Sequence, residues 1–242
     1  MRLYKSRDQY ILKNKKIAEK MVEYAEISDS DCILEVGCGT GVLTEYLIRK
    51  AKKVIGIEID KRFVEYLSKK FGEKLEIIHG DALKVEFPFF DKFVSNIPYS
   101  ISTPITFKVL QYRKKAVIMY QKEFAERIVA TKGKKYGKLS VMVRAYATPK
   151  IVQIVSRKNF SPQPDVDSAI VVFDSEPEIC VKDLNLFRNF ITKCFSMRRK
   201  KLAKILKLMN VPENILKKYG DKRAEEITPE EYAKIFNVLY GQ

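Results

Sequence analysis

The stretch that decides the fold is residues 32–43, which read CILEVGCGTGVL. A short apolar run leads into three glycines, and apolar residues then recur at helical spacing. Glycine lets the backbone turn tightly and lets a ligand approach without interference from a Cβ atom. The order of strand, glycine turn and helix therefore predicts the start of a βαβ unit. Alone, the turn also fits an ordinary βα connection or a dinucleotide site.

Short apolar runs and helical patterns continue to alternate outward from this stretch. Alternation of this kind predicts an α/β fold with a mostly parallel sheet and helices on both faces. Two late runs lie close together and predict an antiparallel edge. The predicted strands are residues 32–36, 53–59, 75–78, 92–95, 116–119, 151–155 and 168–173, and the helices between them include residues 17–25, 43–48, 63–67 and 123–130.

The length of 242 residues suits one large domain with a smaller one. Residues 131–138 are rich in glycine and lysine and are predicted to form a loop. Beyond residues 175–177 the β pattern gives way to helical periodicity as far as residue 239. We therefore predict an α/β domain over residues 1–176 and a small helical domain over residues 177–242.

The formal net charge of +16 is large for this length. A basic field of this size concentrates polyanions, so RNA, DNA and anionic membranes are candidate partners. No run approaches the roughly 20 apolar residues that span a bilayer, and the basic N-terminus lacks the apolar core of a secretory signal. We expect a soluble, cytoplasmic monomer without membrane contact.

Cysteine and histidine give no pattern of metal ligands. The four cysteines form no C-x-x-C pair, and His79 has no ligand partner at helical spacing. We expect no metal site and reduced thiols.

Three successive strand ends carry a glycine turn and two acids. The G-x-G-x-G spacing of Gly37, Gly39 and Gly41 departs from the phosphate-binding fingerprint. Glu58 ends the next predicted strand, where an acid can accept both ribose hydroxyls, and Asp81–Ala82 follow the third, where they can read the edge of an adenine. Each feature alone fits a solvated strand end, but together they predict a site for an adenosyl cofactor without pyrophosphate.

The tetrapeptide of residues 96–99, NIPY, follows the fourth strand at the edge where open α/β sheets bind ligands. The Asn96 side-chain oxygen and the Pro98 carbonyl can accept both N–H groups of an exocyclic amine and aim its lone pair at a sulfonium methyl. Tyr99 offers a ring for a base swung out of its strand. Elsewhere the same residues would be an ordinary turn. After the cofactor pattern they predict methylation of an adenine amine.

Together these residues resemble the small-subunit ribosomal RNA adenine dimethyltransferases of the KsgA type, over nearly the whole chain. The resemblance implies a Rossmann-like class I methyltransferase sheet. It also implies transfer of two methyls from S-adenosylmethionine to the N6 of each of two adjacent adenosines near the 3′ end of small-subunit RNA, and a role in ribosome biogenesis. The matching pieces are residues 9–12, 34–41, 58, 80–82, 96–104 and 160–168.

The resemblance further implies roles for single residues. Tyr10 and Leu12 close over the cofactor from the N-terminal segment, and Phe160 faces Tyr99 across the flipped adenine. By spacing alone, Phe160 fits a core residue entering the last strands equally well. The residues implied to bind the cofactor are Gln9, Tyr10, Leu12, Gly37, Gly39, Glu58, Asp81, Ala82 and Asn96.

The sequence departs from this family at the first motif, where the usual Gln-x-Phe-Leu-x-Asp reads QYILKN over residues 9–14. Ile11 replaces an aromatic residue and Asn14 replaces an acid. The way in which this segment closes over the cofactor therefore has to come from the structure.

Basic residues concentrate in the predicted helical domain. Residues 193–223 hold eleven Lys and Arg against two acids. A solvated face is the usual meaning of such a run, but the overall field and the resemblance favour contact with the RNA backbone. The candidate RNA contacts are Arg198, Arg199, Lys200 and Lys204, with Lys132, Lys134, Lys135 and Lys138 on the glycine loop.

Three other functions remain open at the level of sequence. An adenine methyltransferase for large-subunit RNA would carry the same motifs, although the MRRKKL run at residues 197–202 is more typical of the small-subunit group. A non-catalytic assembly or transcription factor on the same scaffold would bind nucleic acid without turnover. A small-molecule methyltransferase would act on free adenosine.

Overall fold

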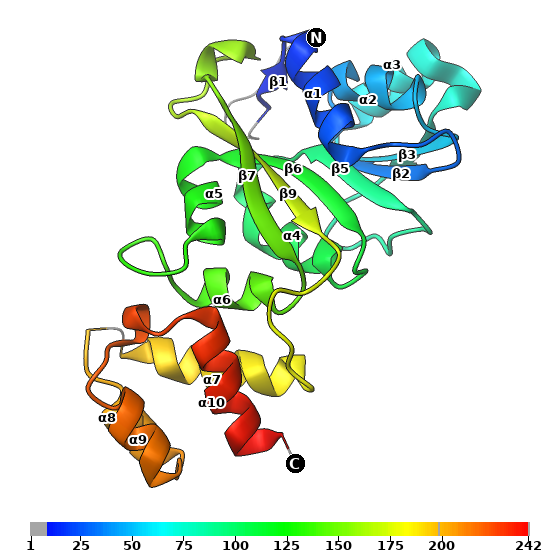
Figure 1. Ribbon diagram of the computed structural model, residues 1–242. Coiled ribbons are helices and arrows are strands. Elements are labelled where there is room, and N and C mark those ends of the chain that lie inside the picture. The colour runs from blue at the N-terminus through cyan, green and yellow to red at the C-terminus, as the bar shows by residue number, and fades with distance from the viewer. Residues whose placement is uncertain (1–8, 198, 242) are drawn as a thin grey trace. The chain divides into compact units, whose positions relative to one another are not determined.

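The computed structural model describes residues 9–197 and 199–241, and this part of the chain contains a seven-stranded sheet in the order β4-β3-β2-β5-β6-β9-β7 (Figure 1). The predicted strands are confirmed. β6 pairs with β9 in the antiparallel sense, as the late runs predicted, while β2, β3, β4, β5 and β6 pair in parallel. The strands are β2 (Cys32–Val36), β3 (Lys53–Glu58), β4 (Glu76–His79), β5 (Lys92–Asn96), β6 (Lys115–Gln121), β7 (Thr148–Val155) and β9 (Ser168–Asp174).

The strand order reverses next to β2. The chain builds outward from β2 through β3 to β4 and then returns to add β5 on the other side of β2, with Ile33 opposite Lys92 and Leu34 opposite Phe93. Open α/β sheets bind ligands at the carboxyl ends of the strands at such a switch point. The topology thus brings the turn after β2 next to the corner after β5.

Helices cover both faces of the sheet, as predicted. Val117 and Met119 of β6 belong to the core cluster that includes Met21 of α1, whereas Tyr120, the next residue, shares a hydrogen bond of 2.6 Å with the Thr106 hydroxyl of α4. Successive side chains on a strand point to opposite faces, so α1 and α4 lie on opposite faces. The helices of this part are α1 (Lys15–Ala25), α2 (Val42–Ile48), α3 (Lys61–Phe71) and α4 (Ser102–Leu110), of which α4 was not predicted.

The division of the chain differs from the predicted one. One compact unit comprises the chain up to Ala125 together with Lys150–Ser175. The other comprises Glu126–Pro149 together with the chain from Glu176 onward. The chain therefore passes between the two units three times, and the predicted boundary near residue 176 is one of these points. Residues 126–149 belong to the second unit because the predicted loop leads into a helix, α6, that packs against α7 and α10. The helices are α5 (Lys122–Val129), α6 (Lys138–Arg144), α7 (Leu184–Ser196), α8 (Ala203–Leu208), α9 (Glu213–Tyr219) and α10 (Pro229–Tyr240), with 3₁₀ turns at Gly72–Lys74, Tyr99–Ile101, Arg157–Asn159 and Ala224–Glu226.

A buried arginine, Arg144, holds Glu126–Pro149 in the second unit. Its guanidinium pairs with the Glu178 carboxylate at 3.0 Å. The last carbonyl groups of a helix lack hydrogen-bond donors within the helix, and this guanidinium supplies such donors. It donates to the carbonyl oxygens of Ile128, Val129, Ala130 and Ser140.

The core of the second unit is rich in aromatic rings. Phe187, Phe190 and Phe236 pack together, and the Tyr232 hydroxyl donates to the Ala224 carbonyl at 2.8 Å. Tyr136 is also fully buried, but its hydroxyl has no hydrogen-bond partner among residues 9–197 and 199–241. A buried hydroxyl without a partner destabilises the fold, because it has lost its hydrogen bonds to water.

These two tyrosines predict opposite effects of the same substitution. Tyr136→Phe removes an unpaired hydroxyl and should raise the free energy of unfolding, by about 1 kcal/mol. Tyr232→Phe leaves a buried carbonyl unpaired and should lower it by about the same amount. Urea unfolding of both variants checks the pair, and equal losses of stability would contradict the assignment of Tyr136.

Candidate active site

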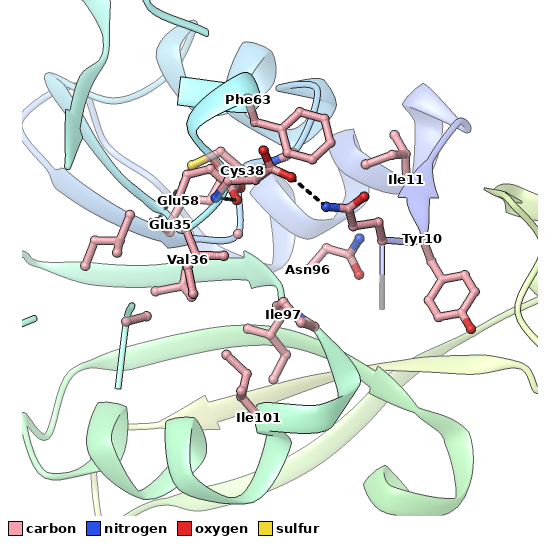
Figure 2. Close-up of a pocket in the computed structure, with 18 of the residues that line it drawn as sticks. Tyr10, Ile11, Glu35, Val36, Cys38, Glu58, Phe63, Asn96, Ile97 and Ile101 are labelled. Carbon is pink, nitrogen blue, oxygen red and sulfur yellow. Dashed lines mark hydrogen bonds between the residues drawn. The ribbon is translucent and has the colours of Figure 1, made fainter. Parts of the chain in front are cut away.

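A pocket of about 380 Å³ lies at the switch point and is lined by the ends of β2, β3 and β5, the loop after β4 and the N-terminal segment. Figure 2 shows Glu35, Cys38 and Glu58 on one side of this pocket, Tyr10 and Ile11 on the other, and Asn96 between them. Most of the predicted site residues line this one pocket. They are Gln9, Tyr10, Leu12, Gly37, Gly39, Glu58, Asp81, Ala82, Asn96, Pro98 and Tyr99.

The turn after β2 requires glycine for two reasons. Gly37, Gly39 and Gly41 have φ angles of +73°, +54° and +76°, in the left-handed region that L side chains rarely adopt. Neighbouring atoms are also close, because a Cβ on Gly39 would lie 2.9 Å from the end of the Ile11 side chain, which would have to shift. The turn is therefore packed closely against the N-terminal segment.

Glu58 is a buried carboxylate of the pocket. It ends β3, is 5% exposed, and accepts hydrogen bonds of 3.0 Å from the backbone N–H groups of Gly39 and Asp60. Burial raises the pKa of this carboxyl, while the two N–H groups oppose the rise. The strand end and the glycine turn thus fix the direction in which Glu58 faces the pocket.

The loop of Asp81 and Ala82 is held in place by Lys108, a residue that was not among the predicted site residues. The Asp81 side chain accepts the Leu83 N–H at 2.9 Å. Lys108 of α4 donates to the carbonyl oxygens of Ala82, at 2.8 Å, and Val85, and its pKa is lowered by burial. Because α4 was not predicted, no signal in the sequence linked Lys108 to this loop.

Two buried serines fix the corner after β5. The Ser95 hydroxyl donates to the Val36 carbonyl at 2.5 Å, which ties the end of β5 to the end of β2. The hydroxyl groups of Tyr99 and Ser168 share a hydrogen bond of 2.7 Å. The Pro98 carbonyl accepts the Ile101 N–H at 3.3 Å and retains a second lone pair. Both serines lie at ends of predicted strands, residues 92–95 and 168–173, and no sequence pattern indicated these contacts.

The N-terminal segment crosses the pocket as a short strand. β1 (Ile11–Leu12) pairs with β8 (Phe160–Ser161) in the antiparallel sense. The Gln9 side-chain amide donates to Asp60 at 3.0 Å. Asn14, which departs from the family pattern, accepts the Lys16 N–H at the start of α1 and donates to the Asn159 side chain at 2.8 Å. These contacts hold the segment over the turn after β2.

Phe160 lies in the core in this structure, so the role that the resemblance implied for it stays a prediction. Its side chain is 1% exposed, belongs to the core cluster beneath β1, and is not among the described residues that line the pocket. The alternative of a core residue, which spacing alone allowed, holds in this structure. The ring that stacks on Tyr99 is Tyr10, at a centroid distance of 5.7 Å and an interplanar angle of 27°.

The basic residues proposed for RNA lie in the second unit. Arg199, Lys200 and Lys204 are exposed and line a hollow together with Phe195 and Met197. The Tyr136 ring packs against Phe195 at 5.8 Å, so the glycine loop with Lys132, Lys134, Lys135 and Lys138 lies beside this hollow. Lys135 is paired with Glu126. Arg198 lies outside the described residues.

Neither a membrane span nor a metal cluster is found within residues 9–197 and 199–241. No helix of this part is long and apolar enough to cross a bilayer. No group of three or more His, Cys, Asp or Glu side chains is placed to hold a metal ion.

Glu35, in the glycine motif, is a pocket residue to which sequence analysis gave no role. It is 2% exposed and accepts a hydrogen bond of 2.6 Å from the Thr44 hydroxyl. Burial raises the pKa of this carboxyl to about 8. At neutral pH the carboxyl is therefore largely protonated in the folded protein.

The raised pKa of Glu35 predicts that the free energy of unfolding depends on pH. Between the ordinary value near 4.5 and about 8, the folded protein keeps a proton on Glu35 that the unfolded chain has released. Raising the pH through this window should therefore lower the free energy of unfolding, by about 1.4 kcal/mol per unit at its centre. Glu35→Gln lacks this term, so its stability relative to the wild type should increase from pH 5 to pH 8 in urea titrations. A difference that does not change with pH would contradict the shift.

Comparison with known proteins agrees with this geometry. Residues 2–240 match the family model for ribosomal RNA adenine dimethylase. Two proteins named probable ribosomal RNA small subunit methyltransferase A are close relatives. That of Methanosarcina mazei is 43% identical over 96% of this chain and 92% of its own length, and that of Pyrococcus furiosus is 45% identical over 91% and 86%.

Two solved structures share the fold over almost the full length. A dimethyladenosine transferase from Plasmodium falciparum superposes with a TM-score of 0.85 and 35% identity, covering 93% of this chain and 95% of that one. The 23S rRNA methyltransferase ErmE gives 0.79 and 28%, covering 95% and 99%. The sheet is thus the Rossmann-like sheet of methyltransferases, as predicted. The chain belongs to the ribosomal RNA adenine dimethylase family.

Proposed function

We propose that this chain transfers methyl groups from S-adenosylmethionine to the N6 of two adjacent adenosines near the 3′ end of small-subunit ribosomal RNA. The protein would act as a monomer in the cytoplasm, and the reaction would be a step of ribosome biogenesis. One observation carries the proposal. A single pocket is lined both by the acids at the ends of β3 and β4 and by the corner of residues 96–99. A nucleoside cofactor and an extruded adenine can therefore meet there.

The pocket fits an adenosyl cofactor. The Glu58 carboxylate faces it and can accept ribose hydroxyls, and Asp81 and Ala82 line it where they can read an adenine edge. The glycine turn presents backbone without Cβ atoms. Glu58 and Asp81 in the lining disfavour phosphate groups, which the cofactor lacks. When bound, S-adenosylmethionine supplies a methyl group on a sulfonium, which is already a good leaving group.

The residues at the β5 end would align the target amine. Its lone pair is delocalised into the adenine ring, which makes the nitrogen a weak nucleophile. The Asn96 side-chain oxygen and the free lone pair of the Pro98 carbonyl can accept its two N–H groups and hold the nitrogen nearer to tetrahedral geometry. Tyr99 can stack on the base. Alignment of this kind supplies a large part of a barrier reduction without a dedicated general base.

The small-subunit substrate is favoured over the large-subunit alternative by the relatives. Proteins named for the small subunit are 43% and 45% identical to this chain, whereas the large-subunit enzyme ErmE is 28% identical. The intact set of pocket residues speaks against a non-catalytic factor. The exposed lysines and arginines of the second unit, Lys132, Lys134, Arg199, Lys200 and Lys204, would bind RNA phosphates.

The function and the amine alignment can be tested together. Purified protein and radiolabelled S-adenosylmethionine are incubated with unmethylated small or large ribosomal subunits, and the labelled nucleosides are identified. We expect N6,N6-dimethyladenosine in small subunits only. Asn96→Ala should lose transfer by at least about 100-fold, because the amine loses an acceptor that orients it.

The matched variant is Asn96→Asp, which keeps an acceptor oxygen at the same point and should retain more activity than the alanine variant. Filter binding of subunits should be similar in all three proteins. Label in large subunits, or full activity of Asn96→Ala, would contradict the proposal.

The basic surface predicts a specific salt effect. Replacing Arg199, Lys200 and Lys204 by Glu should weaken RNA binding and reduce the slope of log K against log salt by about 2 to 3, since three phosphate contacts are lost. Affinity for S-adenosylhomocysteine should not change. The control replaces Lys50, Lys69 and Lys74 by Glu, which alters the net charge equally. If both triple variants lose the same affinity and slope, the net charge rather than this surface binds RNA.

A further inference from the structure

A single turn of the chain carries the residues that would read the adenine of the cofactor. After β4 the Asp81 carbonyl accepts the N–H groups of Lys84 and Val85 at 2.8 and 2.9 Å, so this segment forms one helical turn. The Asp81 carboxylate caps the start of the turn by accepting the Leu83 N–H at 2.9 Å. One isolated turn has little stability of its own, because it fixes several dihedral angles for few hydrogen bonds. Its position therefore depends on contacts from the rest of the fold.

Lys108 supplies such a contact at the other end of the turn. Its ammonium donates to the carbonyl oxygens of Ala82 and Val85, and it lies 4.4 Å from the centre of the Phe87 ring. Carbonyl groups at the end of a helical turn lack donors within the turn, and a cation placed there stabilises them. Asp81 thus caps the start of the turn and Lys108 caps its end.

We propose that Lys108 is the positioning residue for recognition of the cofactor's adenine amino group, because it holds the turn in which the Asp81 carboxylate accepts that group. The inference rests on the proposed function and deepens it. Asp81 and Ala82 line the pocket, whereas Lys108 is not among the described residues of the lining, so Lys108 acts through the turn. The Leu83 N–H uses one Asp81 oxygen, which leaves the other oxygen for a ligand. The chain would thereby select a purine that carries a 6-amino group.

The helix that carries Lys108 also contacts the corner of residues 96–99. α4 begins at Ser102, whose hydroxyl donates to the Tyr99 carbonyl at 2.8 Å. Lys108 lies six residues further along the same helix, or about 9 Å along its axis. The corner has contacts of its own, because the Tyr99 hydroxyl is bonded to Ser168. Loss of the Lys108 ammonium should therefore disturb the adenine turn and leave the corner in place.

Calorimetric binding of two ligands tests this role. One ligand is S-adenosylhomocysteine, and the other is the same compound with purine in place of adenine, which lacks only the amino group. The wild type should bind S-adenosylhomocysteine about tenfold to a hundredfold more tightly, the usual effect of one hydrogen bond to a charged group. Lys108→Met keeps a side chain of similar length without the charge or the donors. It should reduce this preference to about threefold or less.

Lys114→Met is the matched control and should keep the preference of the wild type. Lys114 follows α4, lies over the exposed Phe89 ring, and is not among the described residues of the pocket lining. In an Asp81→Ala background the preference is already lost, so Lys108→Met should not lower it further.

The two ligands separate this role from a general effect on the fold. Equal weakening of both ligands by Lys108→Met, or an unchanged preference, would overturn the inference. A wild type that binds both ligands equally would overturn it too. Failure of the wild type to bind S-adenosylhomocysteine would instead overturn the proposed function.

Hydrogen exchange of the ligand-free protein measures the turn directly. In Lys108→Met the amides of residues 83–85 should exchange about tenfold faster, because the turn loses the donors at its end and opens more often. The amides of β6 should exchange at the wild-type rate in both Lys108→Met and Lys114→Met. Unchanged exchange of residues 83–85, or faster exchange of β6 as well, would overturn the inference.

Discussion

The contact between the ends of β2 and β5 is the constraint on which the rest of the site depends. The Ser95 hydroxyl donates to the Val36 carbonyl, and a Cβ on Gly37 would lie 3.1 Å from the Pro98 ring. The glycine turn and the Asn-Pro-Tyr corner are therefore packed directly against each other. This contact exists because the strand order reverses beside β2. An adenosyl group at the ends of β3 and β4 and an amine at the end of β5 would then meet across the end of β2.

The ends of β2 and β3 place two carboxyls in the pocket at an energetic cost. Burial raises the pKa of both Glu35 and Glu58. Asp60, at the rim, shows the opposite behaviour, because its hydrogen bonds to Arg62 hold the pKa of that carboxyl well below its usual range. A ligand that donates hydroxyl or ammonium groups would replace the lost water around the buried acids. Sites that bind cofactors commonly combine burial with perturbed acids in this way.

The sequence predicts this site well where its residues sit on strand ends and poorly where they act through tertiary contacts. Alternating apolar runs define the strands, so the positions of Glu58 and Asn96 follow from the strands alone. Lys108 and Arg144 could not be predicted, because each acts on backbone carbonyls that only the folded chain brings close. The role implied for Phe160 stays a prediction for a related reason. Residue type says that a ring is present, but the pairing of β1 with β8 decides which ring reaches the pocket.

The two units of the chain also differ in their charged residues: one carries buried carboxyls, and the other carries exposed lysines and arginines. Glu35 and Glu58 of the pocket are buried, so dissolved salt screens them little, whereas the lysines and arginines proposed for RNA that the structure describes are exposed. At physiological ionic strength, exposed charges more than about 8 Å apart are largely screened from each other. Capture of RNA should therefore depend strongly on salt while the geometry of the reacting groups does not.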